Sequence, residues 1–264
     1  MITGAVILWE IQAVVAVVFV AWDVRKNPNA TVMKWAFVIV TAFSGLLGAL
    51  LYVLTCREPL SDTHELLISS RARQVVGSTM HCVAGDGIGI LIAAAIVGPL
   101  GLIKAVDVGL EYVVGFGVGW TIFQALFARS MAGSYVRALR STVFPEFLSM
   151  NALMAGMLAV SIPWMAAVPE AADPTRGTFW FVMSLALSAG FVVAYPVNWW
   201  LVARGLKHGM KTVRPRGDSP MATESATASA PPPRRELVLV TTATLALLAA
   251  GITIAGLATS LTAL

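Results

Sequence analysis

Residues 75–103 read VVGSTMHCVAGDGIGILIAAAIVGPLGLI, and Asp86 is the only one of them with a charged side chain at neutral pH. A helix needs about 20 predominantly apolar residues to cross the roughly 30 Å hydrocarbon core of a bilayer. The stretch is long enough for this, and a soluble domain would have to bury nearly all of it. We therefore expect residues 75–103 to form a membrane-spanning helix.

Six further apolar stretches of similar length surround this one. They cover about residues 4–22, 35–55, 108–128, 147–168, 177–203 and 237–264. The carboxylates within the seven stretches are only Glu10, Asp86 and Glu111. None of the stretches alternates apolar and polar residues as the strands of a transmembrane β-barrel do. The sequence predicts an all-α, polytopic transmembrane bundle of about seven helices.

The composition of the whole chain agrees with this. Of its 264 residues 58% are hydrophobic and 12% are charged, whereas a soluble globular domain has about 25% charged residues. This composition excludes a secreted disulfide scaffold, a disordered protein and a conventional soluble enzyme. The net charge of +4 requires no nucleic-acid partner, because basic residues beside membrane helices are explained by topology and by anionic lipid. The partner that the sequence predicts is the lipid bilayer, and it leaves open a second copy or another membrane protein.

The distribution of Lys and Arg predicts an orientation. The loops after the second, fourth and sixth stretches hold thirteen of the eighteen cations, and cytoplasmic loops are the ones that retain such residues. With seven crossings, the N-terminus is expected in the cytoplasm and the C-terminus outside.

The sequence also predicts a division into parts. Residues 213–235 are low in large apolar residues and rich in Ser, Thr, Ala and Pro, a composition typical of a flexible linker. We expect a transmembrane core of six helices in residues 1–212, a disordered cytoplasmic linker in 213–235, and a loosely tethered transmembrane helix in 236–264.

Polar residues inside membrane helices are costly, so they are the first candidates for function. His81 and Cys82 are adjacent, and Met150, Met154 and Met157 share one helix face at i, i+4 and i+7. Imidazole, thiolate and thioether are the ligands that a soft ion such as Cu(I) prefers. These five residues are the predicted metal ligands, with copper as the candidate cofactor, although they lack the repeated ligand spacing of a strong metal motif.

A second set of polar residues is predicted to handle protons or other ions. Asp86 lies near the midplane, and Glu10, Asn151 and Asn198 are expected in the same cytoplasmic half of the bundle. A buried carboxylate must be protonated, paired or hydrated, so Asp86 is the strongest member. The alternative is that these polar groups only fix helix packing in a non-catalytic membrane scaffold or assembly factor.

Three further residues are predicted to shape the bundle. Gly85 and Gly89, like Gly115 and Gly119, have the small-xxx-small spacing that lets helices approach closely. Pro196 lies inside a predicted helix and is expected to kink it. Hydrolase motifs, phosphate-binding loops and paired haem histidines are absent from the sequence, which favours a protein that is not an enzyme.

Three pieces of the chain resemble one family. They are residues 80–89 (MHCVAGDGIG), 147–157 (FLSMNALMAGM) and 179–201 (FWFVMSLALSAGFVVAYPVNWWL), the last followed by Gly205, Lys207 and Met210. Over about residues 73–210 the chain resembles the bacterial membrane family catalogued as domain of unknown function 4396. It departs from the family at Asp86, where relatives are expected to have a second cysteine, and at Leu153, where they have Phe. The resemblance implies a protein of the inner membrane of a bacterium and supplies no reaction.

Overall fold

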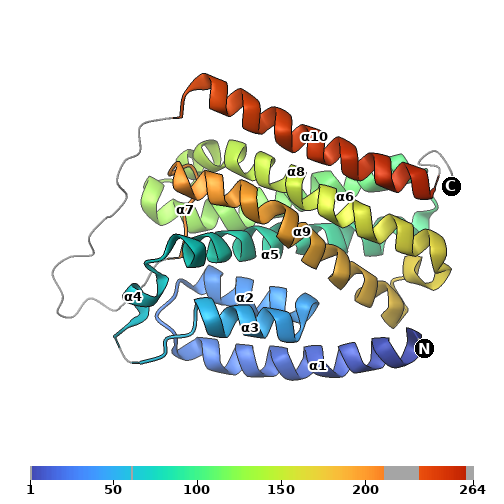
Figure 1. The fold of residues 1–264 in the computed structure, drawn as a ribbon, viewed down its shortest axis with the longest axis horizontal. Helices are drawn as coiled ribbons and strands as arrows, with labels where there is room; N and C mark the ends of the chain where they lie inside the picture. Colours follow the sequence, from blue (N-terminus) through green and yellow to red (C-terminus); the bar gives the residue numbers. More distant parts are fainter. Residues whose placement is uncertain (1, 61, 211–231, 260–264) are drawn as a thin grey trace.

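The computed structural model describes residues 2–60, 62–210 and 232–259, and these form helices joined by short loops, with no strand among them (Figure 1). The α-helices are α1 Ile2–Asp23, α2 Thr31–Ser44, α3 Leu46–Thr55, α4 His64–Ile68, α5 Arg71–Val97, α6 Lys104–Val118, α7 Ala125–Ala132, α8 Tyr135–Ala167, α9 Gly177–Ala203 and α10 Arg234–Ala258. Short 3-10 turns cover Val24–Lys26, Gly98–Leu100 and Pro169–Ala172, and a π-helix, Gly119–Gln124, joins α6 to α7.

Within the described residues, six helical segments are long and apolar enough to cross a membrane. They are Thr3–Lys26, Arg71–Leu100, Lys104–Arg129, Tyr135–Ala167, Gly177–Ala203 and Arg234–Ala258. The predicted all-α membrane bundle is therefore confirmed, and six of the seven apolar stretches each correspond to one of these segments.

The stretch predicted as one helix over residues 35–55 is divided in the structure. It forms α2, with 14 residues, and α3, with 10 residues, which at 1.5 Å per residue measure about 21 and 15 Å. Neither is long enough to span a bilayer. The break lies at Gly45, whose φ of 57° and ψ of −128° are open to glycine because it has no Cβ.

Hydrogen bonds show that α2 and α3 form a hairpin. Asn27, before α2, donates to the hydroxyl of Tyr52 at 2.8 Å, and that hydroxyl donates to Asp23 at 2.7 Å. Arg57, after α3, pairs with the same carboxylate at 2.8 Å. Both open ends of the hairpin thus lie at the end of α1, while its tip reaches the middle of α1, where the Leu46 amide donates to Gln12 at 2.6 Å.

The hairpin changes which loops share an end of the bundle. Because the chain enters and leaves it on one side, α1 ends at the same end at which α5 begins, and α10 begins there too (left in Figure 1). We call this end the basic end. Among the described residues only two cations, Lys104 and Arg176, lie at the other end, which we call the opposite end. The N-terminus of α1 lies at the opposite end.

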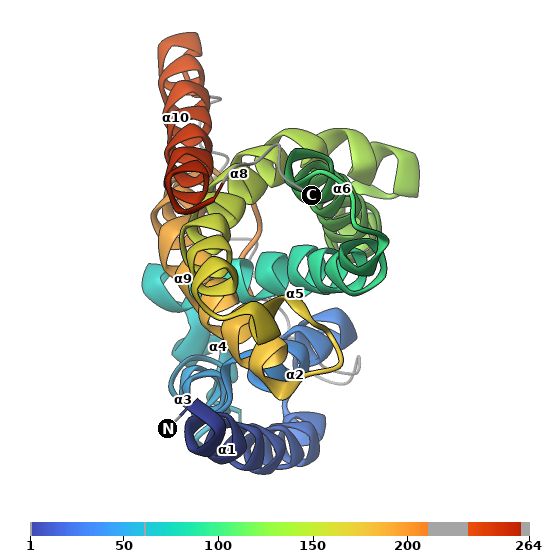
Figure 2. The ribbon, with the colours of Figure 1, turned by 90° about the vertical axis from the view of Figure 1, so that its right-hand side faces the viewer.

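Seen end-on, α5 and α9 occupy the middle of the bundle, with the hairpin and α1 on one flank and α10 on the other (Figure 2). Helices α5 and α6 approach closely through small residues. A Cβ built on Gly85 would lie 2.9 Å from Cα of Gly119, and one on Gly89 would lie 2.7 Å from Cα of Gly115. These contacts bring the backbone of α6 directly against the polar face of α5.

The last helix, α10, packs along α8. A Cβ on Gly251 would lie 2.6 Å from the carbonyl oxygen of Ala155, and Glu236 forms an ion pair with Arg204 after α9. The loose tether predicted for this helix rests on the linker 213–235, most of which lies outside the described residues. The division into core, linker and added helix stays a prediction.

Candidate functional site: a buried cluster of acidic groups

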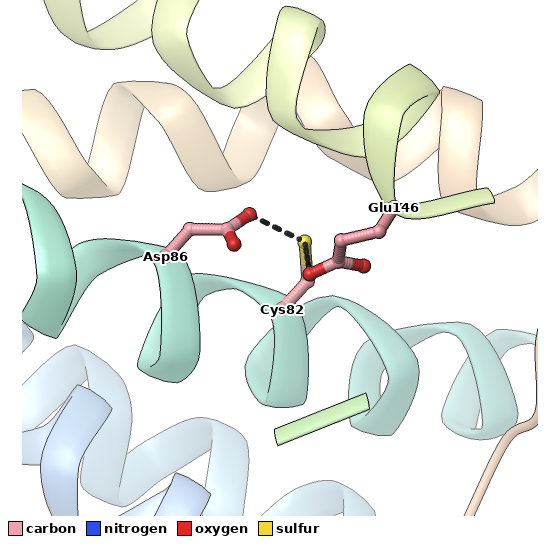
Figure 3. Close-up of side chains that lie close together, drawn as sticks. All are labelled: Cys82, Asp86 and Glu146. Carbon is pink, nitrogen blue, oxygen red and sulfur yellow. Dashed lines mark hydrogen bonds between the residues drawn. The ribbon is translucent and has the colours of Figure 1, made fainter. Parts of the chain in front are cut away.

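Three acidic side chains meet in the interior of the bundle. Cys82 and Asp86 come from α5 and Glu146 comes from α8, and their potential ligand atoms all lie within 4.8 Å of one another (Figure 3). All three residues are fully buried. We call these three residues the acid cluster.

The spacing of Cys82 and Asp86 along α5 explains why these two side chains meet. Residues four apart share one face of a helix, and Cys82 donates its S–H to Oδ2 of Asp86 at 3.1 Å. The same sulfur lies 3.7 Å from Oε1 of Glu146. Oδ1 of Asp86 has no hydrogen-bond partner among the described residues, although buried polar atoms nearly always have one.

A lysine completes the charges around the acid cluster. Nζ of Lys207 lies 3.0 Å from Oε2 of Glu146 and 3.0 Å from the hydroxyl of Ser149. That hydroxyl donates in turn to Oδ1 of Asn198 at 2.8 Å. The ion pair is buried, because the side chains of Lys207 and Glu146 are 3% and 0% exposed.

The turn after α9 places Lys207 inside the bundle. Gly205 adopts a φ of 66°, a conformation common just after helix ends and favourable for glycine. The amides of Leu206 and Lys207 then donate to the carbonyl of Leu201 at 2.9 and 3.2 Å, which turns the chain back toward α5. Burial lowers the pKa of an ammonium, but the acidic groups around Lys207 outweigh this and hold its pKa above the ordinary value. The ion pair with Glu146 gives Lys207 the opposite charge that a buried ammonium requires.

The formal charges of this region do not cancel. With both carboxyl groups ionised, Asp86 and Glu146 carry two negative charges, and Lys207 supplies one positive charge. A net charge held away from water is costly unless it is neutralised or paired. One further positive charge, whether a proton or a metal ion, would balance the site.

A π-helix borders the acid cluster. It begins at Gly119, and a Cβ built on this residue would overlap Oδ1 of Asp86 and lie 3.0 Å from Oε1 of Glu146. Only a residue without a side chain fits there. Single π-helical turns inside α-helices are frequent at functional sites, and this one adjoins the Asp86 oxygen that lacks a partner.

His81, a predicted metal ligand, does not join the acid cluster. Adjacent helical residues point about 100° apart, and the His81 ring packs on Phe123 and Phe127 with ring centroids 5.7 and 5.0 Å away. Its Nε2 has no partner among the described residues. Of the two adjacent residues, only Cys82 faces Glu146.

The predicted methionine face is divided between two neighbours. Met150 approaches α6, with Cε 3.0 Å from a Cβ built on Gly115, whereas Met157 approaches α9, with Cγ 3.1 Å from one built on Gly190. Met154, which lies between them in the sequence, is buried. Met150, unlike Met157, approaches the region of Asp86, because the carbonyl oxygen of Asp86 lies 3.1 Å from the same Cβ position on Gly115.

The predicted polar layer is also divided. Asn198 belongs to the hydrogen-bond network of Lys207, two residues after Pro196 within α9. Asn151 instead accepts from Tyr112 of α6 at 2.7 Å and donates to Thr244 of α10 at 3.5 Å.

Glu10 lies far from the other members of that layer. It is exposed, and its carboxylate lies against Gly177, the first residue of α9 at the opposite end of the bundle. Along α9 this is about 30 Å from Asn198 at 1.5 Å per residue. The structure therefore separates Glu10 from Asp86.

Sequence reasoning missed Glu146, Ser149, Lys207 and the role of Gly119 beside Asp86. Glu146 lies one residue before the apolar stretch 147–168 and so was not counted as intramembrane, although Pro145 at its side does not end α8. Lys207 follows the last matching piece of the family resemblance and lies outside every predicted helix, so it was not expected in the interior. The signal that could have found it is the Gly-x-Lys sequence directly after α9.

One known sequence family matches the part of the chain that contains the acid cluster. The sequence model of the family described as "Domain of unknown function (DUF4396)" matches residues 72–207. The chain belongs to this family. The matched region of this DUF4396 protein begins at α5 and ends at Lys207, so it contains the acid cluster and its lysine and leaves out α1, the hairpin and α10. No curated protein and no solved structure matches the chain.

Proposed function

We propose that this DUF4396 protein binds one exchangeable cation at Cys82, Asp86 and Glu146 and passes it across the membrane. The observation that carries the proposal is the charge balance of the buried site, in which two carboxyl groups face a single ammonium. Lys207 is held by Glu146 at 3.0 Å, so this fixed cation leaves Asp86 to be balanced by a mobile one. Intramembrane ionisable groups of this kind commonly mark ion or proton pathways.

A proton is the cation that the geometry favours. The thiol of Cys82 already donates to Asp86, and a proton shared between the carboxyl groups needs no further ligands. A soft metal ion would instead take the thiolate, and His81 lies outside the group of ligand atoms that would hold it. The metal prediction is therefore kept as one outcome of the experiment.

The proposed orientation places the basic end in the cytoplasm, because Lys and Arg are retained on that side of the membrane. Because of the hairpin, Arg25, Lys26 and Lys34 lie at the same end as Arg57. The excess of cations at the basic end is therefore larger than it would be in a chain with seven crossings. The N-terminus then lies outside, in contrast to the expectation from the sequence. The cytoplasmic membrane of a bacterium remains the proposed location.

The test is proton flux into liposomes that contain the full chain and enclose a pH-sensitive dye, driven by a potassium diffusion potential. The unaltered protein is expected to conduct above protein-free liposomes, and Asp86→Asn and Glu146→Gln are expected to reduce the flux to background. Glu170→Gln is the matched control, because Glu170 is an exposed carboxylate in the turn before α9.

Metal analysis of the purified protein forms the second arm. A stoichiometric soft metal that is lost in Cys82→Ser but kept in Glu170→Gln would assign the site to a metal ion. Neither flux nor metal, with all variants folded, would refute the proposal and favour the scaffold. The close contact of Gly85 with Gly119 gives the scaffold its own test, because Gly85→Leu should then disrupt assembly with a partner, whereas Asp86→Asn should not.

A further inference from the structure

A second acidic pair, Asp107 and Glu111, lies on α6, the helix that leads into the π-helix beside the acid cluster. Asp107, Glu111, Gly115 and Gly119 are spaced by four residues, so each lies next to the following one in a stripe that winds gradually around the helix. Gly115 and Gly119 face α5 and Asp86. The stripe therefore leads from the acid cluster to the start of α6 at the opposite end of the bundle.

The group of charged residues at the start of α6 has the same composition as the group around the acid cluster. Lys104 pairs with Oδ2 of Asp107 at 2.6 Å, and Glu111 lies one turn further along. Two carboxyl groups and one lysine again leave one unbalanced negative charge, as Asp86, Glu146 and Lys207 do.

One oxygen of this second pair points independently to a missing ligand. Asp107 is 5% exposed, and its Oδ1 is buried without a hydrogen-bond partner among the described residues. Such an oxygen normally binds a donor or a cation. The side chain of Lys104, 31% exposed, keeps this group in reach of the surface, as does the half-buried Glu111.

We propose that Asp107 and Glu111 form an outer cation-binding station, which exchanges the cation of the acid cluster with the side of the membrane opposite Lys207. This inference rests on the proposed function, since it names the second binding site of the same pathway. The cation is a proton or the metal ion that the acid cluster binds, and the proton is the probe in the experiments below.

An apolar contact separates the two stations. Glu111 precedes Gly119 by eight residues, or about 12 Å at 1.5 Å per residue. Between them, Ile90 and Met150 reach within 2.6 and 3.0 Å of a Cβ built on Gly115. Met150 has three rotatable bonds and adapts readily to changes in packing. Passage between the stations therefore requires this contact to open, which prevents a continuous leak.

The first experiment tests access to the outer station without relying on transport. Glu111→Cys in the full chain is exposed to a membrane-impermeant methanethiosulfonate that carries a sulfonate, from each side of the membrane in turn. We expect labelling from the side of Lys104 and none from the basic end. The unaltered protein is the control, because its two cysteines are buried and should not react. A folded Glu111→Cys protein that stays unlabelled, or that reacts only from the basic end, would overturn the outer station.

The second experiment tests the titratable carboxyl group in the proton-flux assay. Glu111→Cys and Asp107→Asn should lower flux, a carboxyethyl methanethiosulfonate, which attaches a new carboxyl group, should restore it in Glu111→Cys, and a trimethylammonium reagent should not. Glu170→Gln, on the same side, should conduct normally. If the unaltered protein conducts while Glu111→Gln and Asp107→Asn equal it, the outer station is refuted and the acid cluster stands. If the unaltered protein does not conduct, the proposed function fails, and the labelling result alone decides whether the outer station exists.

Discussion

Nζ of Lys207 lies 3.0 Å from Oε2 of Glu146, in an ion pair that joins the end of α9 to α8 in the interior of the bundle. Two buried charges attract each other strongly, but much of that attraction is offset by their loss of hydration. Removing only one partner is therefore far more damaging than removing both.

Lys207→Met should destabilise the protein by about 3–5 kcal/mol, because it leaves Glu146 as an unpaired buried charge. The double variant Lys207→Met with Glu146→Gln should recover most of that loss. The measurement is the free energy of unfolding in detergent for the two single variants and the double variant. Additive losses would show that the two residues do not interact in the folded protein.

Gly119→Ala should impair the acid cluster, because its Cβ would overlap Oδ1 of Asp86. The matched control is Gly117→Ala two residues earlier in α6, where a Cβ would meet nothing within 4 Å. In a helix interior this control should gain about 0.5–1 kcal/mol of stability. Thermal unfolding and proton flux are measured for both. Equal behaviour of the two variants would mean that Asp86 does not approach Gly119 as described.

The re-entrant hairpin predicts which residues share a side of the membrane. Cysteines introduced at Arg25 and Leu60 should be labelled by an impermeant thiol reagent from one side, and a cysteine at Gly4 from the other. A single helix across residues 35–55 would instead place Arg25 and Leu60 on different sides. The labelling pattern in sealed membranes of known orientation therefore distinguishes the two topologies.

Gly45→Ala should destabilise the hairpin for two reasons. Its φ is 57°, where a side chain costs of order 1–3 kcal/mol, and its Cβ would overlap the Gln12 amide. Gly101→Ala is the milder comparison, because Gly101 lies in the left-handed helical region, with φ 63° and ψ 36°, and has nothing within 4 Å of its Cβ. The drop in unfolding temperature should be larger for Gly45→Ala. Similar drops would show that neither the ψ of Gly45 nor its contact with Gln12 adds to the cost.

The sequence by itself determined the fold class. Stretches such as 75–103 and 177–203 are apolar over the length of a membrane helix, and hydrophobic burial in lipid depends on that local composition alone. The spacing of Cys82 and Asp86 likewise placed them on one face without knowledge of any other helix. Family membership also followed from local sequence, since the matched residues 72–207 include the pieces that carry the resemblance.

The tertiary structure alone decided how these parts combine. Hydropathy could not distinguish one helix over residues 35–55 from two, because the break depends on the backbone of Gly45 and on its contact with Gln12. It also could not bring Lys207, outside every predicted helix, to Glu146, because that pairing depends on the turn at Gly205 and on the packing of α9 against α8. Local composition fixes which segments enter the membrane, whereas the balance of buried charges arises only between helices that are distant in sequence.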